Sequence, residues 1–199
     1  MTPAPVDHPH GTWVFGYGSL VAVESLTGTI GRRPLPGERH AAHLTGYGRR
    51  WNYGSLHLRG DWTHDGVEVR RGLVVSLGLV PAADERCNGV IVHVTEEELA
   101  LLDWRERDYE RTDVTERLAL DAPEDSVRGR VVTYVPRPSA IERYEEARDA
   151  RRAAVRQTYW DLVHQSFDEL GGAHPGLWSS TPRPDVPVAD VRVHRLDAG

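Results

Sequence analysis

The residue best suited to chemistry is Glu106, near the end of an expected helix. It follows Leu99 and Leu102, which define the apolar face of that helix, by seven and four residues, so we expect its side chain on the buried face. A carboxyl group held there has a pKa above the usual value of about 4.3 and suits general acid–base catalysis near neutral pH. In this interpretation Arg105 points to water. The alternative is a structural ion pair of Glu106 with Arg105 or Arg111, and the spacing leaves both open.

A glycine-rich turn, Gly16-Tyr17-Gly18-Ser19-Leu20, follows the first apolar segment. Consecutive backbone N–H groups in such a turn can hold an anion or a developing oxyanion, although a turn without a ligand fits equally well. The turn lacks the third glycine of a dinucleotide-binding motif and the G-x-S-x-G pattern of a serine nucleophile. A later copy, Tyr53-Gly54-Ser55-Leu56, is interpreted as coincidence or as pocket wall.

Metal ligands are also present in the sequence, but their spacing fits no known motif. His40 and His43 could share one face of a helix, and His8 and His10 flank a proline, yet neither pair has a third ligand at a recognisable spacing. We therefore expect neither a metal nor a cofactor and rank a histidine-dependent metalloenzyme last. The only cysteine, Cys87, excludes an internal disulfide and is expected to be small, buried and inert.

Composition narrows the classes of function. The 199 residues include 39% hydrophobic and 27% charged residues, which is ordinary for a soluble globular protein, and no segment is apolar enough to cross a membrane. The net charge is −6, which argues against nucleic-acid binding. All 24 basic residues are arginine, which excludes lysine Schiff bases and P-loop phosphate binding. The first residues carry no secretion signal, so we expect a cytoplasmic protein.

The elements that position these residues follow from local patterns. Strand character appears in six segments: 12–19, 39–53, 72–80, 89–94, 112–120 and 128–135. Thr95 and Glu98 form a capping box that opens the helix carrying Glu106, which should end near Arg107. A second capping box, Ser139 to Glu142, opens one long helix or two shorter ones that end at Gly171-Gly172.

The remaining segments are expected to be loops or termini. Residues 21–37 predict a loop with a short helical turn, and residues 54–70 a polar excursion. We expect three parts: a loose N-terminal arm at 1–11, one domain at 12–172, and a Pro-rich tail at 173–199 that packs on the domain and adds an edge strand over 186–196. Because strands come first and the longest helix last, the order favours an α+β fold.

Taken together, these motifs resemble the γ-glutamylcyclotransferase superfamily. The resemblance rests on Phe15-Gly16-Tyr17-Gly18-Ser19-Leu20, on the run from Leu102 to Arg111 (LDWRERDYER), and on Tyr134 in a later strand, and it covers roughly residues 12 to 136. One departure is Arg107, which stands where relatives commonly have a glycine. The segments 54–70 and 173–199 have no counterpart that can be mapped.

The resemblance implies a compact mixed β-barrel with flanking helices and a cofactor-independent enzyme, a lyase or acyltransferase of glutathione metabolism. It would cyclise a γ-glutamyl group to 5-oxoproline and release an amine, an amino acid or a dipeptide. Glu106 would be the general acid and base. The residues implied in binding the small-molecule γ-glutamyl substrate are Tyr17, Gly18, Ser19, Leu20, Tyr109 and Tyr134.

Three questions stay open at this stage. A non-catalytic protein that binds a small molecule or acts as a scaffold on the same fold is the alternative to an enzyme. The leaving group is not defined, although Arg49, Arg50, Trp51 and Asn52 are candidates for the wall of its pocket. The oligomeric state cannot be inferred from the sequence.

Overall fold

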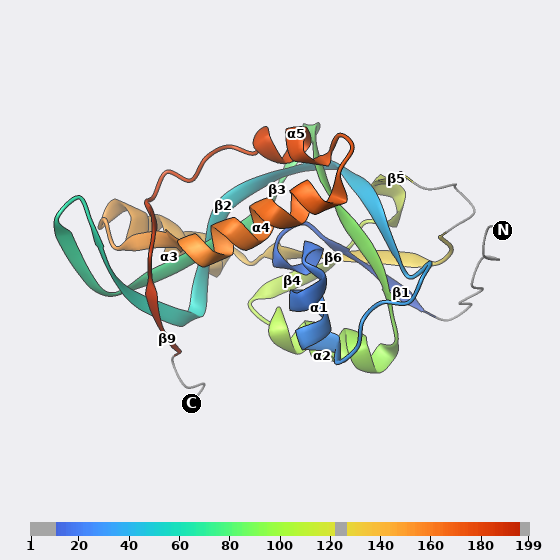
Figure 1. Ribbon diagram of the computed structural model, residues 1–199, viewed down its shortest axis with the longest axis horizontal. Helices are drawn as coiled ribbons and strands as arrows, with labels where there is room; N and C mark the ends of the chain where they lie inside the picture. The colour runs from blue at the N-terminus through green and yellow to red at the C-terminus, as the bar shows by residue number, and fades with distance from the viewer. Residues whose placement is uncertain (1–10, 122–126, 196–199) are drawn as a thin grey trace.

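The computed structural model describes residues 11–121 and 127–195, which contain one large mixed sheet and flanking helices (Figure 1). The strands are β1 (Thr12–Gly16), β2 (Arg39–His64), β3 (Val67–Val94), β4 (Tyr109–Asp113), β5 (Leu118–Leu120), β6 (Arg130–Pro136), β7 (Ala153–Arg156), β8 (Val188–Ala189) and β9 (Arg192–Arg195). The helices are α1 (Val23–Ile30), α2 (Glu96–Arg105), α3 (Pro138–Asp149), α4 (Gln157–Leu170) and α5 (His174–Ser179), with 3-10 turns η1 (Ser19–Val21) and η2 (Thr115–Arg117). The predicted α+β class is confirmed.

Strand β1 is central to the sheet and delivers the glycine-rich turn. The strand order is β4-β6-β1-β3-β2-β5, with β1 antiparallel to β3 and parallel to β6. Its residues Val14 and Phe15 are buried, as expected for a strand covered on both faces. Where β1 ends, a Cβ on Gly89 of β3 would lie 2.2 Å from the Gly16 carbonyl oxygen, so only glycine permits this close approach of the two backbones. The glycine-rich turn therefore leaves the sheet from a fixed position.

Strands β2 and β3 form one long hairpin, which the sequence analysis divided incorrectly. The two strands predicted at 72–80 and 89–94 are parts of β3, and residues 54–70 form the tip of the hairpin rather than a polar excursion. At the tip Asp65 and Gly66 have φ values of 49° and 76°, the left-handed conformations of a type I′ turn. The Asp-Gly pair was the sequence signal for this turn. The strand predicted at 112–120 is likewise divided into β4, η2 and β5.

The described part of the C-terminal segment packs on the far end of the hairpin. Strand β9 pairs antiparallel with β2, and β8 pairs parallel with β7. A second small core lies between them, with Trp62, Val69 and Val74 packed against Ala189 and Val191. Figure 1 shows this segment running from α5 back to β9 beside the hairpin. Residues 1–10 of the expected arm and 196–199 of the tail lie outside the described residues, and the division into domains stays a prediction.

The loop predicted at 21–37 and the second capping box were wrong, whereas two shorter helices, one of the two alternatives for the segment that ends at Gly171, are present. Residues 21–37 contain α1, a helix of eight residues, rather than a loop with one turn. Helix α3 begins at Pro138 after Arg137, and no side chain caps it, so the second capping box does not form. Strand β7 separates α3 from α4 because Arg151 takes a φ of 54° and Ala153 then pairs with Leu73 of β3. The predicted end of α4 at Gly171 is confirmed.

The capping box of α2 is confirmed. The Glu98 N–H donates to the Thr95 hydroxyl (3.2 Å), and the Thr95 N–H donates to the Glu98 carboxylate (3.0 Å). Leu99 and Leu102 are buried, so the helix presents the face that the spacing predicted. Its last helical residue is Arg105, two residues before the expected end.

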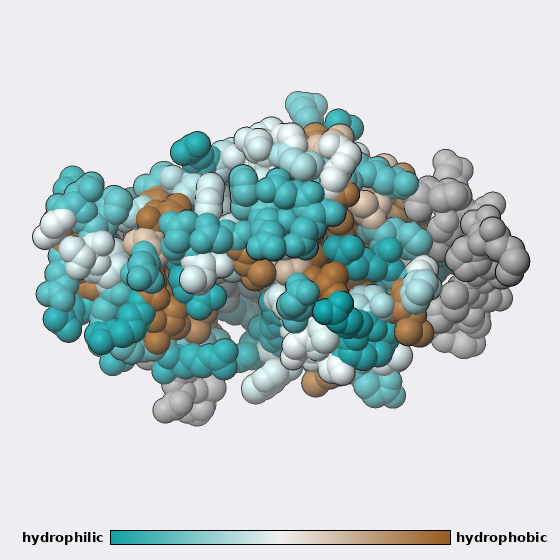
Figure 2. Space-filling model, viewed as in Figure 1, coloured by the Kyte–Doolittle hydropathy of each residue, from teal (hydrophilic) through white to brown (hydrophobic). Residues whose placement is uncertain are grey.

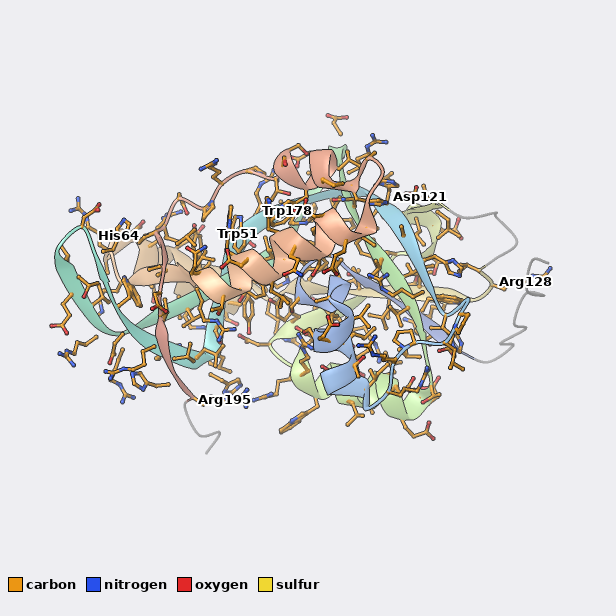
Figure 3. All side chains as sticks on the ribbon, viewed as in Figure 1. Trp51, His64, Asp121, Arg128, Trp178 and Arg195 are labelled. Atoms are coloured by element: carbon orange, nitrogen blue, oxygen red, sulfur yellow. The ribbon has the colours of Figure 1, made fainter. Side chains whose placement is uncertain are left out.

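Helix α4 covers the main core through a layer of aromatic side chains. Trp51 of β2 stacks on Trp160 with ring centroids 5.1 Å apart, and Phe167 stacks on Trp178 at 5.1 Å. Trp51 and Trp178 lie beside this helix in Figure 3. Figure 2 shows that the same face of the molecule is mostly hydrophilic, with hydrophobic residues in small separate groups. In the described part of the chain no helix is long and apolar enough to cross a bilayer, and the cytoplasmic location stays a prediction.

Candidate active site

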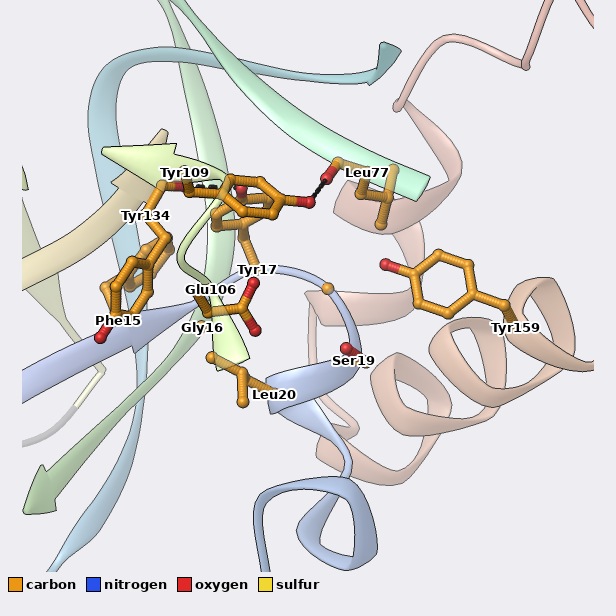
Figure 4. A pocket seen from close by; sticks show the side chains of 11 residues that line it. Phe15, Gly16, Tyr17, Ser19, Leu20, Leu77, Glu106, Tyr109, Tyr134 and Tyr159 are labelled. Carbon is orange, nitrogen blue, oxygen red and sulfur yellow. Dashed lines mark hydrogen bonds between the residues drawn. The ribbon is translucent and has the colours of Figure 1, made fainter. Parts of the chain in front are cut away.

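A pocket beside the end of β1 is lined by Glu106 and by all six residues that the resemblance implied in substrate binding (Figure 4). The space inside it, including its open mouth, is about 330 Å³. Its lining residues are Phe15, Gly16, Tyr17, Gly18, Ser19, Leu20, Leu77, Glu106, Tyr109, Tyr134 and Tyr159. Five segments that are separate in the sequence thus meet at one small cavity.

Glu106 is placed in this pocket by the end of α2. It is the C-cap residue, and its N–H donates to the Leu102 carbonyl oxygen at 2.8 Å. Its own carbonyl oxygen accepts from the Tyr109 N–H at 2.8 Å, which closes a tight turn into β4. The side chain is 16% exposed, and in Figure 4 its carboxylate lies in the middle of the pocket, between Leu20 and Tyr17. The expectation that Glu106 faces inward agrees with this geometry.

Arg105 does not point to water, contrary to the sequence interpretation. Its Nε lies 2.9 Å from Glu106 Oε1, and its Nη2 donates to Ser19 Oγ at 2.8 Å. The same guanidinium donates to the Ser25 carbonyl oxygen (3.1 Å) and to Thr29 Oγ1 (2.5 Å) on α1. The ion pair and the pocket position were treated as alternatives for Glu106, but the structure contains both. Arg105 joins the carboxylate, the glycine-rich turn and α1.

Burial raises the pKa of Glu106 above its ordinary value, because the carboxylate loses hydration in the pocket. The charge and the hydrogen bond of Arg105 act in the opposite direction and lower the pKa. The first effect is the larger one. The carboxyl therefore takes up a proton more readily than an exposed glutamate, while Arg105 stabilises its ionised form, and a group with both properties can accept and return a proton.

The glycine-rich turn continues directly into the 3-10 turn η1. The Val21 N–H donates to the Gly18 carbonyl oxygen (2.9 Å), and the Ala22 N–H donates to the Ser19 carbonyl oxygen (3.1 Å). A Cβ on Gly18 would lie 3.0 Å from the Tyr159 hydroxyl oxygen, so glycine at this position gives Tyr159 room to approach the turn. These bonds fix the part of the turn that faces Glu106.

Tyr159 of α4 closes the pocket opposite β1. Burial raises its pKa to about 12, although the backbone N–H groups of Leu77 and Ser19 interact with its hydroxyl oxygen and lower the pKa. In Figure 4 this hydroxyl points toward Leu77 and the turn. Tyr159 therefore brings a neutral hydroxyl to the glycine-rich turn.

Tyr17, Tyr109 and Tyr134 line the pocket with their rings, and their hydroxyl groups are hydrogen-bonded within the protein. The Tyr17 hydroxyl donates to the Tyr134 carbonyl oxygen (2.7 Å), and the Tyr109 hydroxyl donates to the Leu77 carbonyl oxygen (3.1 Å). Burial raises the pKa of both Tyr17 and Tyr109 well above the ordinary value, so both stay protonated. The Tyr134 hydroxyl donates to Asp103 at 2.9 Å, so it faces away from the carboxylate while the ring lines the cavity.

Sequence reasoning missed four lining residues: Phe15, Gly16, Leu77 and Tyr159. The first two belong to the recognised Phe-Gly-Tyr-Gly-Ser-Leu motif, and the motif was therefore the signal. Leu77 and Tyr159 were assigned to strand and helix patterns, and no local pattern indicates that they reach this pocket.

The segment from Arg49 to Asn52, a candidate for the pocket wall, does not line this cavity. Arg49 is buried, stacks on Phe167 and Trp178, and bonds to Asn88, while Arg50 pairs with Glu85. The second Tyr-Gly-Ser-Leu copy lies in β2, where Tyr53 stacks on Tyr109 with ring centroids 4.2 Å apart. Tyr53 thus packs against Tyr109, which lines the pocket, without lining the pocket itself. Cys87 is buried, as predicted.

A buried carboxylate that faces a backbone turn across a small pocket defines a site for acid–base chemistry on a small molecule. The chain matches the ChaC-like protein family over residues 12–157, about three quarters of its length, and it belongs to this family. This confirms the resemblance to the γ-glutamylcyclotransferase superfamily. No curated protein matches the chain.

Solved structures share the fold. A yeast γ-glutamyl cyclotransferase described as specific to glutathione aligns with a TM-score of 0.56 and 14% identity, over 87% of this chain and 97% of its own. Another γ-glutamyl cyclotransferase aligns with a TM-score of 0.52 and 13% identity, over 88% and 89% of the two chains. An uncharacterised human protein aligns with a TM-score of 0.50 and 14% identity, over 87% and 89%. At these identities the likeness is one of fold.

Proposed function

We propose that this protein is a γ-glutamylcyclotransferase, which converts a γ-glutamyl compound to 5-oxoproline and releases the attached amine, amino acid or dipeptide. The observation that carries the proposal is the position of Glu106: its carboxylate is mostly buried, paired with Arg105, and faces the Tyr17–Leu20 turn in one pocket. Family membership and the folds of the structural neighbours support it.

The reaction is a cyclisation within the substrate. The α-amino nitrogen attacks the γ-carbonyl carbon, a five-membered lactam forms, and the original γ-amide bond breaks. Well-oriented intramolecular reactions reach effective molarities of about 10⁵ M or more, so holding the γ-glutamyl group in a bent conformation supplies much of the rate. The protein must then move protons and stabilise the oxyanion.

Glu106 fits the proton transfers. Its carboxylate would take a proton from the α-ammonium group, which frees the nitrogen lone pair, and would later give a proton to the leaving nitrogen. Burial raises its pKa and favours the second step, whereas the Arg105 ion pair keeps the ionised form available for the first. One carboxyl can therefore serve both steps.

The Tyr17–Leu20 turn would bind the oxygen atoms of the substrate. Its backbone N–H groups suit either the α-carboxylate or the oxyanion that develops on the γ-carbonyl, and losing one oxyanion donor costs about 10²-fold or more in rate. The Tyr159 hydroxyl already interacts with the Ser19 N–H, so it either donates to the bound oxygen or is displaced by it. Tyr109 and Tyr134 would enclose the carbon chain of the glutamyl group.

The proposal is tested with a panel of substrates. The purified protein is incubated with glutathione, a γ-glutamyl amino acid and a γ-glutamyl amine, and 5-oxoproline is quantified. We expect 5-oxoproline from at least one of them, with glutathione first because one structural neighbour is specific to it. Stabilisation of the protein by these compounds without any product would instead show a binding protein that has kept the fold.

A further inference from the structure

Three side chains from distant parts of the sequence meet outside the pocket. Among the described residues, His43, Asp121 and His174 form one group whose candidate ligand atoms all lie within 4.8 Å of one another. His43 Nε2 lies 3.0 Å from Asp121 Oδ1, and His174 Nε2 lies 2.8 Å from Asp121 Oδ2. None of the three lines the Glu106 pocket. We propose that these residues bind one divalent transition-metal ion, of which Zn²⁺ is the representative, through two imidazoles and one carboxylate.

The three residues come from three separate parts of the fold. His43 lies in β2, in register with Asn88 of β3 and with Ala119 of β5. Asp121 directly follows β5, and its N–H donates to the Ala41 carbonyl oxygen at 3.1 Å. His174 is the first residue of α5. The sequence analysis paired His40 with His43, but residues three apart in a strand face opposite sides. The other two ligands come instead from the residue after β5 and from the start of α5.

The distances are close to those of a metal site. Two ligand atoms that each lie about 2.1 Å from a tetrahedral zinc ion are about 3.4 Å apart. The observed separations, 3.0 Å to Asp121 Oδ1 and 2.8 Å to Asp121 Oδ2, are about 0.4 and 0.6 Å shorter than this, and the candidate ligand atoms of the two histidines lie within 4.8 Å of each other, so a small adjustment of the three side chains is needed. Two histidines with one carboxylate are a donor set of catalytic zinc and non-haem iron sites, whereas Mg²⁺ and Ca²⁺ prefer oxygen ligands.

Burial and access also suit an ion. The side chains of His43 and His174 are 15% and 6% exposed, so the imidazoles are fixed by packing. The Asp121 side chain is 41% exposed, so an ion can enter beside it, and water can complete the coordination. In Figure 3 Asp121 lies at the edge of the molecule, near the end of α4. The site would tie α5 to the β2–β5 edge of the sheet.

Zinc binding would change some of the hydrogen bonds around these residues. Asn88 Nδ2 lies 3.2 Å from His174 Nδ1, while Asn88 Oδ1 accepts from Arg49 at 2.8 Å. A metal on His174 Nε2 moves the imidazole proton to Nδ1, so the Asn88 amide must rotate and present Oδ1. Arg49 keeps its bond to the Asn88 main-chain carbonyl oxygen. Coordination through His43 Nε2 likewise places the proton on Nδ1, which is buried without a hydrogen-bond partner, so zinc binding must offset the cost of this buried N–H.

Binding is measured by isothermal titration calorimetry of ZnCl₂ into the full chain after removal of metals with EDTA. We expect one equivalent of Zn²⁺ to bind, no binding of Mg²⁺, and a rise in Tm with zinc. Asp121→Asn and His43→Gln should each weaken zinc binding by more than the 10- to 100-fold typical of losing a supporting residue of a metal site. His194→Gln is the matched control, because His194 also pairs with an aspartate, Asp61, at 3.0 Å, but belongs to no group of three candidate ligands among the described residues.

No zinc binding by the wild-type chain would overturn the proposal. Binding that both Asp121→Asn and His43→Gln leave unchanged would overturn it too, because it would indicate adventitious binding by histidines elsewhere. Tm values without zinc establish that the variants fold. A measurement without variants uses Co²⁺, whose d–d absorption is intense at a tetrahedral site and weak in an aqueous octahedral one, so weak bands at saturation also count against the site. Asn88→Asp should tighten binding, because its carboxylate accepts the His174 Nδ1 proton. These readouts do not involve 5-oxoproline and are independent of the proposed activity.

Discussion

Replacing Arg105 with methionine should move the acidic limb of the pH–rate profile upward. The variant removes the guanidinium that lies 2.9 Å from the Glu106 carboxylate but keeps the length of the side chain. Without that charge, burial acts on the pKa of Glu106 alone, and the pKa rises further. Glu106 must be ionised to accept the proton of the α-ammonium group. As the pH falls, the variant therefore loses activity at a higher pH than the wild type does.

The size of the shift follows from the bond that is lost. A hydrogen bond to a charged group contributes about 1.5–3 kcal/mol, and one pKa unit corresponds to about 1.36 kcal/mol, so the expected shift is about 1 to 2 pH units. Arg105 also donates to Ser19 Oγ on the glycine-rich turn. We therefore expect a lower kcat at the optimum as well, because the turn loses a fixed contact.

The assay is kcat/KM for 5-oxoproline formation as a function of pH. Arg107→Met is the matched control, since Arg107 bonds to the Trp104 carbonyl oxygen and pairs with no carboxylate that the structure describes. Arg105→Lys keeps the charge and should recover most of the wild-type profile. An acidic limb that stays in place in folded Arg105→Met would show that the limb does not report Glu106, and the reasoning would be refuted.

Three further predictions concern stability, each measured by urea denaturation. Tyr17→Phe should lower the free energy of unfolding by about 1–3 kcal/mol, because it removes a buried 2.7 Å hydrogen bond and leaves the Tyr134 carbonyl oxygen without that donor. Tyr47→Phe is the control. An equal effect of both changes would contradict a stabilising role for the Tyr17 hydrogen bond. Thr95→Ala should cost about 1 kcal/mol through loss of the α2 cap, and no loss would mean that the capping box contributes nothing. Glu106→Gln should have a larger free energy of unfolding than the wild type at pH 8 and an equal one at pH 4. The raised pKa of Glu106 in the folded state stabilises the wild type below the unfolded pKa, and this stabilisation is lost as the pH rises through the folded pKa. A difference in unfolding free energy that stays constant between pH 4 and pH 8 would argue against the raised pKa.

The site could be predicted from sequence wherever one segment carries the information. Thr95 and Glu98 fix the start of α2, and the spacing from Leu102 then sets the direction of Glu106. The Phe-Gly-Tyr-Gly-Ser-Leu motif placed the turn at the end of β1, where the structure has it. The order of the two motifs along the chain matched the family, and this predicted that the Glu106 segment and the glycine-rich turn contact the same ligand.

What could not be predicted depends on contacts between distant segments. Arg105 was expected in water because its partners, Ser19 and the residues of α1, are about 80 positions away. Tyr159 reaches the pocket only because β7 pairs with β3 and sets the start of α4. The same holds for His174, whose partner Asp121 lies 53 positions earlier. The hairpin tip was different, since the Asp65-Gly66 pair was a local signal that the analysis overlooked.

The central claim is that Glu106 transfers the protons of a cyclisation that produces 5-oxoproline. The most direct test compares 5-oxoproline release by the wild type and by Glu106→Gln, together with calorimetric binding of the substrate to the variant. The account predicts that release is abolished while the fold and the binding are retained. Normal turnover by Glu106→Gln would contradict it.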